Sequence, residues 1–458
     1  MDYLSRRQLL KLGVAAAAGA ISTPYFIPSA ALASKGRPGA NDRITVGVIG
    51  VGCRARLLID QLPRQGQIAS LADCYLKQCK APHRYNDDRS KSSNNPIWRI
   101  HQDYRKLLDE KDIDAVIVAT PDHGRVLPCI LACQAGKDIY AEKPLSLYIE
   151  EGRALVKAAR KHKRILQVGS QQRSMEINRI ACEFVRNGGL GKIRKIKGLN
   201  FWAANPIPDL PKESVPDGLD WDQWLGQAPL RPYNHRLYSN WRRWWDYGGG
   251  DITNMGAHAL DQVQWALGAD DTGPVEFWPV TPGQKEFVRG QKPAAPCPVT
   301  PGKNGKVSYR YANGIQVDLE LKEKHGPDCG AVFAGENGKL EINRNKITSN
   351  PKSIAAELLK TINVEQQERT WSDKTALWQA GDHLKNWLDC IVSRRTPNAD
   401  VEIGHRSITV CHLVNIAREV GRKITWDPVK EQIVGDEEAN KLVNRSRRKG
   451  FELPDVAS

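Results

Sequence analysis

One stretch of the sequence, GGGDITNMGAHALD at residues 248–261, carries side chains that could move a proton. Its histidine, His258, has an unperturbed pKa near neutrality and could act as a general base. Asn254 precedes it by one helical turn, at a place where a carboxylate would be the usual partner of a base. An amide can orient an imidazole through hydrogen bonds, but it cannot accept a proton or stabilise an imidazolium by charge. That charge would have to come from Asp251 or Asp261.

A second stretch, ITVGVIGVGCRARLLIDQL at residues 44–62, reads as a dinucleotide-binding turn. A β-branched run leads into Gly50-x-Gly52-x-x-Ala55, and a helical pattern follows. Glycines at these places let the backbone approach a pyrophosphate at the N-terminus of the helix. The turn residues expected to contact the cofactor are Gly50, Gly52, Cys53 and Arg54.

The choice between NAD and NADP rests on Asp73. It ends the next predicted strand, within QIASLAD, about 20 residues after the glycine turn. A carboxylate at that place holds the adenosine ribose 2′-OH and repels a 2′-phosphate. NAD is therefore the expected cofactor and NADP is less favoured. An unrelated α/β domain with a glycine turn after its first strand is the alternative.

Strands and helical stretches alternate through the rest of the first half. Strands are predicted at residues 115–119 and 138–141, and they run into the polar motifs Thr120-Pro121-Asp122-His123 and Glu142-Lys143-Pro144. Strands separated by helices of this length form a parallel, doubly wound sheet, and ligands bind beyond the carboxyl ends of its strands. Both motifs are therefore expected at the ligand-binding edge of the sheet.

The chain changes character after residues 165–174, which are predicted to form the strand that leaves the first domain. Eight of the thirteen tryptophans lie between Trp202 and Trp278. Aromatic faces stack on sugar rings, but they also fill cores and subunit interfaces. We assign Trp202 and Trp244 to a ligand and the others to packing.

Two alternating segments in the second half predict β-hairpins, each with an Asn-Gly turn, at residues 307–321 and 331–342. Residues 252–267 are predicted to form one amphipathic helix, with Asn254 and His258 on its polar face. From spacing alone, that face could equally be the solvated side of the helix. The expected fold class is α/β, with a Rossmann-type doubly wound parallel sheet followed by an α+β domain that has a large open, mainly antiparallel sheet.

The glycine turn, ATPDH and AEKP, in this order and at these distances, resemble the motifs of the Gfo/Idh/MocA family of nicotinamide-dependent sugar oxidoreductases. LDWDQWLGQAPLRPYN, GHRS and IVGDEEANKL are further similar to a twin-arginine-exported subgroup. The resemblance covers about residues 44–442. It implies an NAD-binding domain over residues 42–170 and a substrate-binding and oligomerisation domain over residues 171–458, in a homo-oligomer that is a dimer or a tetramer.

The resemblance also implies roles for single residues. Lys143 would reach the substrate hydroxyl and the nicotinamide ribose, and Pro144 would fix its turn, often as a cis peptide in this family. His258 matches the histidine that acts as the family's base, whereas Asn254 stands where the family has an aspartate. The other expected cofactor contacts are Thr120, Pro121, His123 and Glu142, and the expected substrate contacts are Arg173, Trp202, Trp244, Asp251, Asn254 and His258.

Three functions remain open at this point. The first is an NAD(H)-dependent oxidoreductase that transfers hydride between nicotinamide and a sugar hydroxyl. The second is a glycoside hydrolase or lyase that uses NAD for a transient oxidation before elimination. The third is a non-catalytic sugar or nucleotide-binding protein, which Asn254 makes conceivable. Arg173, Arg242 and Arg243 hint at an acidic or sulfated substrate, although arginines beside tryptophans are often structural.

The first residues resemble an export signal rather than a part of the fold. SRRQLLK places Arg6 and Arg7 before an apolar stretch at residues 12–21, and an A-x-A pattern ends at Ala33. We therefore expect twin-arginine translocation, cleavage near Ala33 and a periplasmic location. Because no nicotinamide pool exists there, the cofactor is expected to be tightly bound.

Composition excludes several other classes. The chain of 458 residues has a formal net charge of +15, but its charges are scattered, so nucleic acid is not an expected partner. Its ten histidines and ten cysteines never cluster at ligand spacing, and no metal site is expected. No stretch approaches the roughly 20 apolar residues that a membrane-spanning helix needs.

Overall fold

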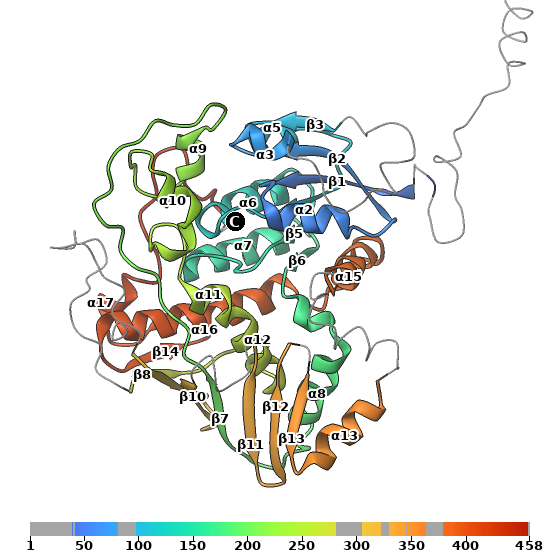
Figure 1. Ribbon diagram of the computed structural model, residues 1–458, viewed down its shortest axis with the longest axis vertical. Coiled ribbons are helices and arrows are strands. Elements are labelled where there is room, and N and C mark those ends of the chain that lie inside the picture. The colour runs from blue at the N-terminus through green and yellow to red at the C-terminus, as the bar shows by residue number, and fades with distance from the viewer. Residues whose placement is uncertain are drawn as a thin grey trace, which may run out of the picture. The chain divides into compact units, whose positions relative to one another are not determined.

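The computed structural model describes residue 39 and residues 42–80, 98–280, 305–321, 329–344, 346–362 and 379–456. Residues 44–458 form one compact unit, which contains the labelled helices and strands of Figure 1. The predicted export segment, residues 1–33, lies outside the described residues.

The first half folds around a six-stranded parallel sheet with the strand order β3-β2-β1-β4-β5-β6. The order reverses between β1 and β4, and ligands of doubly wound sheets bind at such a switch point. The predicted Rossmann-type sheet is confirmed. Its strands are β1 (Ile44–Ile49), β2 (Gly66–Ala72), β3 (Arg99–His101), β4 (Ala115–Val118), β5 (Asp138–Ala141) and β6 (Leu166–Val168).

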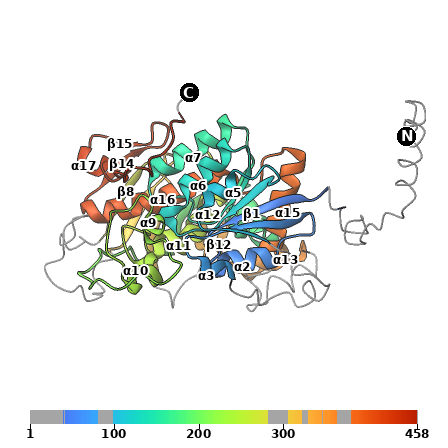
Figure 2. The same cartoon turned by 90° about the horizontal axis from the view of Figure 1, so that it is seen from above.

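Helices cover both faces of this sheet, as Figure 2 shows from above. Strands β4 and β5 are buried along their whole length, and β4 is accordingly apolar throughout rather than alternating, whereas β5 begins with Asp138. One face packs against α2 (Cys53–Asp60) and α15 (Gln379–Ser393), and the other packs against α5 (Tyr104–Leu108), α6 (Val126–Gln134) and α7 (Ile149–Lys161). Helix α15 comes from near the end of the chain, and its Trp387 is fully buried there.

The second half holds a nine-stranded sheet with the order β13-β12-β11-β7-β10-β9-β8-β14-β15. All its described pairs are antiparallel except β7 with β10. Both predicted hairpins are confirmed, since β9 pairs with β10 and β11 with β12. The strands are β7 (Ile193–Leu199), β8 (Glu276–Pro279), β9 (Val307–Arg310), β10 (Gln316–Leu321), β11 (Ala331–Gly335), β12 (Gly338–Ile342), β13 (Ile347–Asn350), β14 (Ile424–Asp427) and β15 (Gln432–Ile433).

Helices α12 (Gly256–Ala266) and α16 (Val401–Val420) lie between the two sheets in Figure 1, and α12 contacts β7, β11 and α8 (Glu176–Arg186). None of the described helices combines the length and the hydropathy that crossing a bilayer requires. The remaining helices are α3 (Leu76–Lys80), α8 (Glu176–Arg186), α9 (Trp221–Leu225), α10 (His235–Ser239), α11 (Asp251–Asn254), α12 (Gly256–Ala266), α13 (Lys352–Lys360), α16 (Val401–Val420) and α17 (Glu437–Asn440).

Two predictions of local structure are wrong. The predicted helix over residues 252–267 breaks at Met255 into α11 and α12, and every residue of α12 is buried, so its polar side is not a solvated face. The predicted strand over residues 165–174 ends at Val168. Gly169 then passes so close to Glu142 that an added Cβ would lie 2.8 Å from the carboxyl carbon.

Candidate functional site

Lys143 and Asn254 connect the two halves of the molecule. The ammonium of Lys143 donates hydrogen bonds to the backbone oxygen of Asn254 at 3.0 Å and to its side-chain oxygen at 2.8 Å. In a continuous helix that backbone oxygen would accept from the amide of His258. Because the helix breaks, the His258 amide donates to the oxygen of Met255 instead, at 3.1 Å. The break therefore frees an acceptor for Lys143.

His258 lies on the first turn of α12 and is 6% exposed. Burial lowers the pKa of its imidazole well below 6.5, and the positive charges of Lys143, Arg344 and Arg54 lower it further. The ring is therefore neutral at physiological pH, the form in which it can accept a proton. No hydrogen bond to the ring comes from any described residue, so both nitrogens are available to a ligand.

Lys143 follows β5 and joins Pro144 through a cis peptide bond. Burial lowers the pKa of its ammonium from 10.5 to about 8, against the opposing effect of the carboxylates of Glu142 and Asp122. Its hydrogen-bond partner, Asn254, is neutral. A cation held so close to losing its proton suits a group that stabilises a developing negative charge.

The glycine turn and the AEKP motif meet through an ion pair. Arg54 Nε donates to Glu142 Oε1 at 2.7 Å, and Glu142 Oε2 accepts from the backbone amide of Lys143 at 3.0 Å. Burial raises the pKa of this carboxyl group, but the Arg54 guanidinium, together with the charges of Lys143 and Arg125, more than offsets burial and holds the pKa below 4.5. Glu142 thus fixes the backbone of Lys143 and balances Arg54.

The turn after β1 fits a dinucleotide. Gly50 has φ +81°, and a Cβ there would lie 2.8 Å from the amide nitrogen of Thr120, so the loops after β1 and β4 touch only because this residue is glycine. A Cβ on Gly52 would meet nothing within 4 Å, which leaves its backbone open at the start of α2. Asp73 Oδ2 accepts from the amide of Val51 at 2.7 Å, which holds the carboxylate beside the turn.

Asp122, in the motif after β4, is a second buried carboxylate near Lys143. It is 2% exposed, and its Oδ1 lies 3.5 Å from Nη1 of Arg125 without a hydrogen-bond partner among the described residues. Burial raises its pKa to about 6 in spite of the charges of Arg125 and Lys143. Sequence reasoning quoted its motif but gave Asp122 no role.

Two family models match the chain. The model described as "Oxidoreductase family, NAD-binding Rossmann fold" matches residues 44–170, and the one described as "Oxidoreductase family, C-terminal alpha/beta domain" matches residues 191–453. The chain belongs to the Gfo/Idh/MocA oxidoreductase family. Its first domain is an NAD-binding Rossmann fold, and the cofactor expected from Asp73 agrees with that description.

Relatives of this Gfo/Idh/MocA protein differ in the activities that their names state. Levoglucosan dehydrogenase of Pseudarthrobacter phenanthrenivorans is 33% identical over 256 residues, which cover 53% of this chain and 58% of that enzyme. A glycosyl hydrolase family 109 protein of Solibacter usitatus is 32% identical over 157 residues, 33% of this chain and 35% of that protein. These matches span less than two thirds of each relative.

Solved structures resemble the fold over a greater length. The WlbA dehydrogenase of Bordetella pertussis, in complex with NADH and UDP-GlcNAcA, superposes with a TM-score of 0.59 at 18% identity. The match covers 85% of this chain and 99% of that one. At this identity the likeness establishes the shared fold and nothing about the substrate.

Two of the residues assigned to ligands lie in an aromatic cluster. His123 is 1% exposed, its Nε2 lies 2.7 Å from the backbone oxygen of Trp224, and its ring packs against Trp224 and Tyr247. Trp244 is buried in the same aromatic cluster, and its indole donates to the oxygen of Arg236 at 3.2 Å. Both rings therefore contribute to packing in this cluster, and their assignment to ligands stays a prediction.

Arg173 is likewise committed to the core. Its guanidinium is buried and makes ion pairs with Asp261 at 2.9 Å and Asp270 at 2.7 Å. Asp261 also accepts from the hydroxyl of Ser407 at 2.6 Å. Arg173 and Asp261 are therefore held by each other, and the substrate contact of Arg173 and the charge from Asp261 to His258 stay predictions.

The other predicted site residues keep their candidacy. Trp202 is 46% exposed, and its backbone oxygen accepts from the amide of Ile252 at 3.0 Å, which places it beside the start of α11. Asp251 is exposed at the first position of that helix. Cys53 is an exposed thiol at the start of α2. Thr120 and Pro121 are half-buried directly after β4.

Sequence reasoning missed Arg344, whose charge acts on both Lys143 and His258. It lies between β12 and β13, far from either residue in the sequence, and no motif marks it. Only the pairing of the second sheet could have indicated its place.

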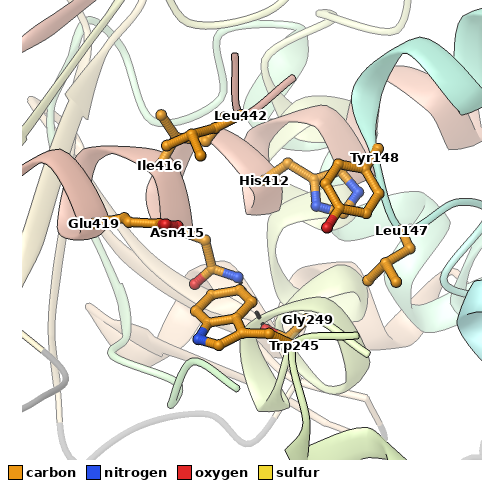
Figure 3. A pocket seen from close by; sticks show the side chains of 9 residues that line it. All are labelled: Leu147, Tyr148, Trp245, Gly249, His412, Asn415, Ile416, Glu419 and Leu442. Atoms are coloured by element: carbon orange, nitrogen blue, oxygen red, sulfur yellow. Dashed lines mark hydrogen bonds between the residues drawn. The ribbon is translucent and has the colours of Figure 1, made fainter. Parts of the chain in front are cut away.

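A pocket behind the glycine run 248–250 is separate from this site (Figure 3). Neither Lys143 nor His258 lines it. Asn415 donates from its amide to the backbone oxygen of Gly249 at 2.9 Å, so helix α16 supports the turn that leads into α11. The residues that line this pocket are Leu147, Tyr148, Trp245, Gly249, His412, Asn415, Ile416, Glu419 and Leu442.

Proposed function

We propose that this protein is an NAD(H)-dependent oxidoreductase that transfers hydride between nicotinamide and a hydroxyl-bearing carbon of a sugar or sugar derivative. One observation carries the proposal. Lys143, at the end of a strand of the NAD-binding domain, is hydrogen-bonded to Asn254, one helical turn from the buried, neutral imidazole of His258.

Each side chain has one task in this proposal. His258 takes the proton of the sugar hydroxyl, because its depressed pKa keeps a nitrogen lone pair available. Lys143 stabilises the negative charge that develops on the hydroxyl oxygen. Asn254 orients Lys143 by accepting two of its hydrogen bonds. The Rossmann domain would hold NAD through the backbone at Gly50 and Gly52 and through Asp73, and bound NAD supplies the hydride acceptor.

A glycoside hydrolase or lyase that oxidises its substrate only transiently is the second candidate. The similarity to a glycosyl hydrolase family 109 protein, which covers 33% of this chain, favours this candidate. The same Lys143 and His258 would serve, because the hydroxyl must lose its proton in either reaction.

The test is to purify the protein, identify any bound cofactor by native mass spectrometry, and then add NAD and a panel of sugars. The oxidoreductase predicts growth of the reduced-nicotinamide absorbance with a sugar. Release of a sugar or aglycone without net reduction would support the second candidate. A preparation without cofactor, with only weak affinity for NAD and no turnover of any sugar, would contradict both.

Arg6, Arg7 and the A-x-A pattern ending at Ala33 support export by the twin-arginine translocase, so we place the proposed activity in the periplasm, in a homo-oligomer with a tightly bound cofactor. Fractionation of cells that express the full chain tests the location. A Lys-Lys substitution at Arg6 and Arg7 should retain the protein in the cytoplasm. Light scattering of the mature protein tests the oligomer.

A further inference from the structure

Two cations in the site have only neutral partners. Lys143 is hydrogen-bonded to the amide of Asn254, and Arg344 donates from Nε to the side-chain oxygen of Gln172 at 3.2 Å. The other charges pair with one another. Arg54 has Glu142, and Arg125 has Asp122. Within the described residues, neither Lys143 nor Arg344 makes an ion pair with a carboxylate.

Arg344 is held in place by several contacts. Its backbone amide donates to Asn343 Oδ1 at 2.7 Å, and the side chain of Gln172 links its Nε to the backbone of His258. Gln172 is 2% exposed and also donates to the oxygen of Cys329 at 2.9 Å, so its orientation is fixed. The two terminal nitrogens of Arg344 have no hydrogen-bond partner among the described residues.

Two cations that have no carboxylate as a direct partner, beside a buried base, work against proton transfer. The charges of Lys143 and Arg344 both lower the pKa of His258, which weakens it as a base. An anion bound at this place would offset both charges and raise that pKa. A planar guanidinium with two free donors also matches an oxyanion group in two-point geometry.

We infer that the substrate itself supplies the missing negative charge, so that the sugar carries a carboxylate or a sulfate ester that Arg344 binds beside Lys143. This inference rests on the proposed function and adds the substrate class. The inference also explains why position 254 holds an amide rather than a carboxylate. A carboxylate at that position would neutralise Lys143 and repel an anionic sugar, whereas an amide does neither.

The experiment compares matched sugars on the NAD-loaded protein: D-glucuronate with D-glucose, D-galacturonate with D-galactose, and D-glucose 6-sulfate as the sulfate ester. The expected result is a higher kcat/KM for the anionic member of each pair. Arg344→Gln should reduce that preference by about 10- to 100-fold, the effect of losing a hydrogen bond to a charged group. Preference for the sulfate over the uronates would identify the sulfate as the anion.

Two further variants make the test specific. Lys346→Gln removes one positive charge from an exposed residue of the same turn and should leave the preference unchanged. Asn254→Asp adds a carboxylate beside Lys143 and should reduce the preference even if Arg344→Gln fails to fold. Equal kcat/KM for neutral and anionic sugars, or loss of NAD affinity in Arg344→Gln without a change in preference, would overturn the inference.

Binding separates this inference from the proposed function. If no sugar reduces NAD, the oxidoreductase proposal has failed, and thermal melts of the NADH-loaded protein then decide the inference alone. Glucuronate or glucose 6-sulfate should raise the melting temperature more than glucose does, and Arg344→Gln should abolish the difference. Equal shifts for all three sugars would refute an anion site.

Discussion

The backbone oxygen of Asn254 lies 3.0 Å from the ammonium of Lys143 and does not accept the amide hydrogen of His258. One interrupted helical hydrogen bond therefore connects the NAD-binding domain to the helix that carries the base. The break separates two roles: Asn254, before Met255, binds the ammonium of Lys143, and α12, after Met255, carries the imidazole of His258.

Replacement of His258 by Gln should reduce the rate of sugar oxidation by about 10²- to 10⁴-fold, the usual contribution of a general base. NAD affinity should stay within twofold, because the glycine turn is unchanged. Steady-state kinetics and fluorescence titration with NADH measure the two effects. His235→Gln makes the same change at an exposed histidine and should leave the rate unaltered. Normal turnover by His258→Gln would refute the assigned base.

Replacement of Lys143 by Met should stabilise the fold while it removes activity. The folded pKa of about 8 is below the ordinary 10.5, so the buried ammonium costs about 3 kcal/mol at pH 7. Loss of the hydrogen bonds to Asn254 reduces that gain in stability by roughly 1 kcal/mol. The charged Lys143 destabilises the fold fully below pH 8. This destabilisation fades as the pH rises toward 10.5, because Lys143 loses its proton at a lower pH in the folded state than in the unfolded state. Urea unfolding should show a net gain of about 2 kcal/mol at pH 7 that shrinks by pH 9.5, and a lower stability of the variant at pH 7 would contradict this.

The pH dependence of kcat/KM, which reports the groups of the free protein, follows from the same residues. Activity should fall above about pH 8, where Lys143, flanked by Glu142, Asp122, Arg344 and Arg54, loses its proton. On the acid side, the lowered pKa of His258 predicts no decline centred at 6.5, and the first group to titrate there is Asp122, at about 6. In Asp122→Asn the limb near pH 6 should disappear. A profile that rises steadily through pH 8 to 10 would show that the neutral amine is the active form.

Replacement of Arg54 by Met should destabilise the protein by about 3 kcal/mol at pH 7, because it leaves the carboxylate of Glu142 buried without its cation. The pKa of Glu142 is lowered in the folded state, so this contribution is present at neutral pH and is lost as the pH falls below 4.5. The double variant with Glu142→Gln should recover most of the loss. Denaturation at pH 7 measures all three proteins, and a double variant no more stable than Arg54→Met would refute the pairing.

The first domain was predictable because its signals are local. The strand at residues 138–141 has the predicted bounds, and Gly50 and Gly52 lie where the fingerprint places them. A chain segment that is buried on both sides reads as a continuous apolar run, whatever its neighbours are. The same locality explains why both Asn-Gly hairpins were predicted correctly.

The remaining features depend on contacts between distant segments. The acceptor freed by the break at Met255 is used by Lys143, which is more than 100 positions away, and no helical pattern encodes that contact. His123 has the spacing of a loop residue, but α9 and the residues around Tyr247 bury it. Arg344 reaches the site through the pairing of β11 with β7 and β12, which a single sequence does not reveal.

The most direct test of the proposed centre is a single-turnover measurement of nicotinamide reduction by NAD-loaded wild-type protein, His258→Gln, Lys143→Met and the double variant. If the two side chains act on the same proton transfer, each single variant should lose at least 10²-fold, and the double variant should lose little more than the worse single one. Reduction at the wild-type rate in either single variant would contradict the account.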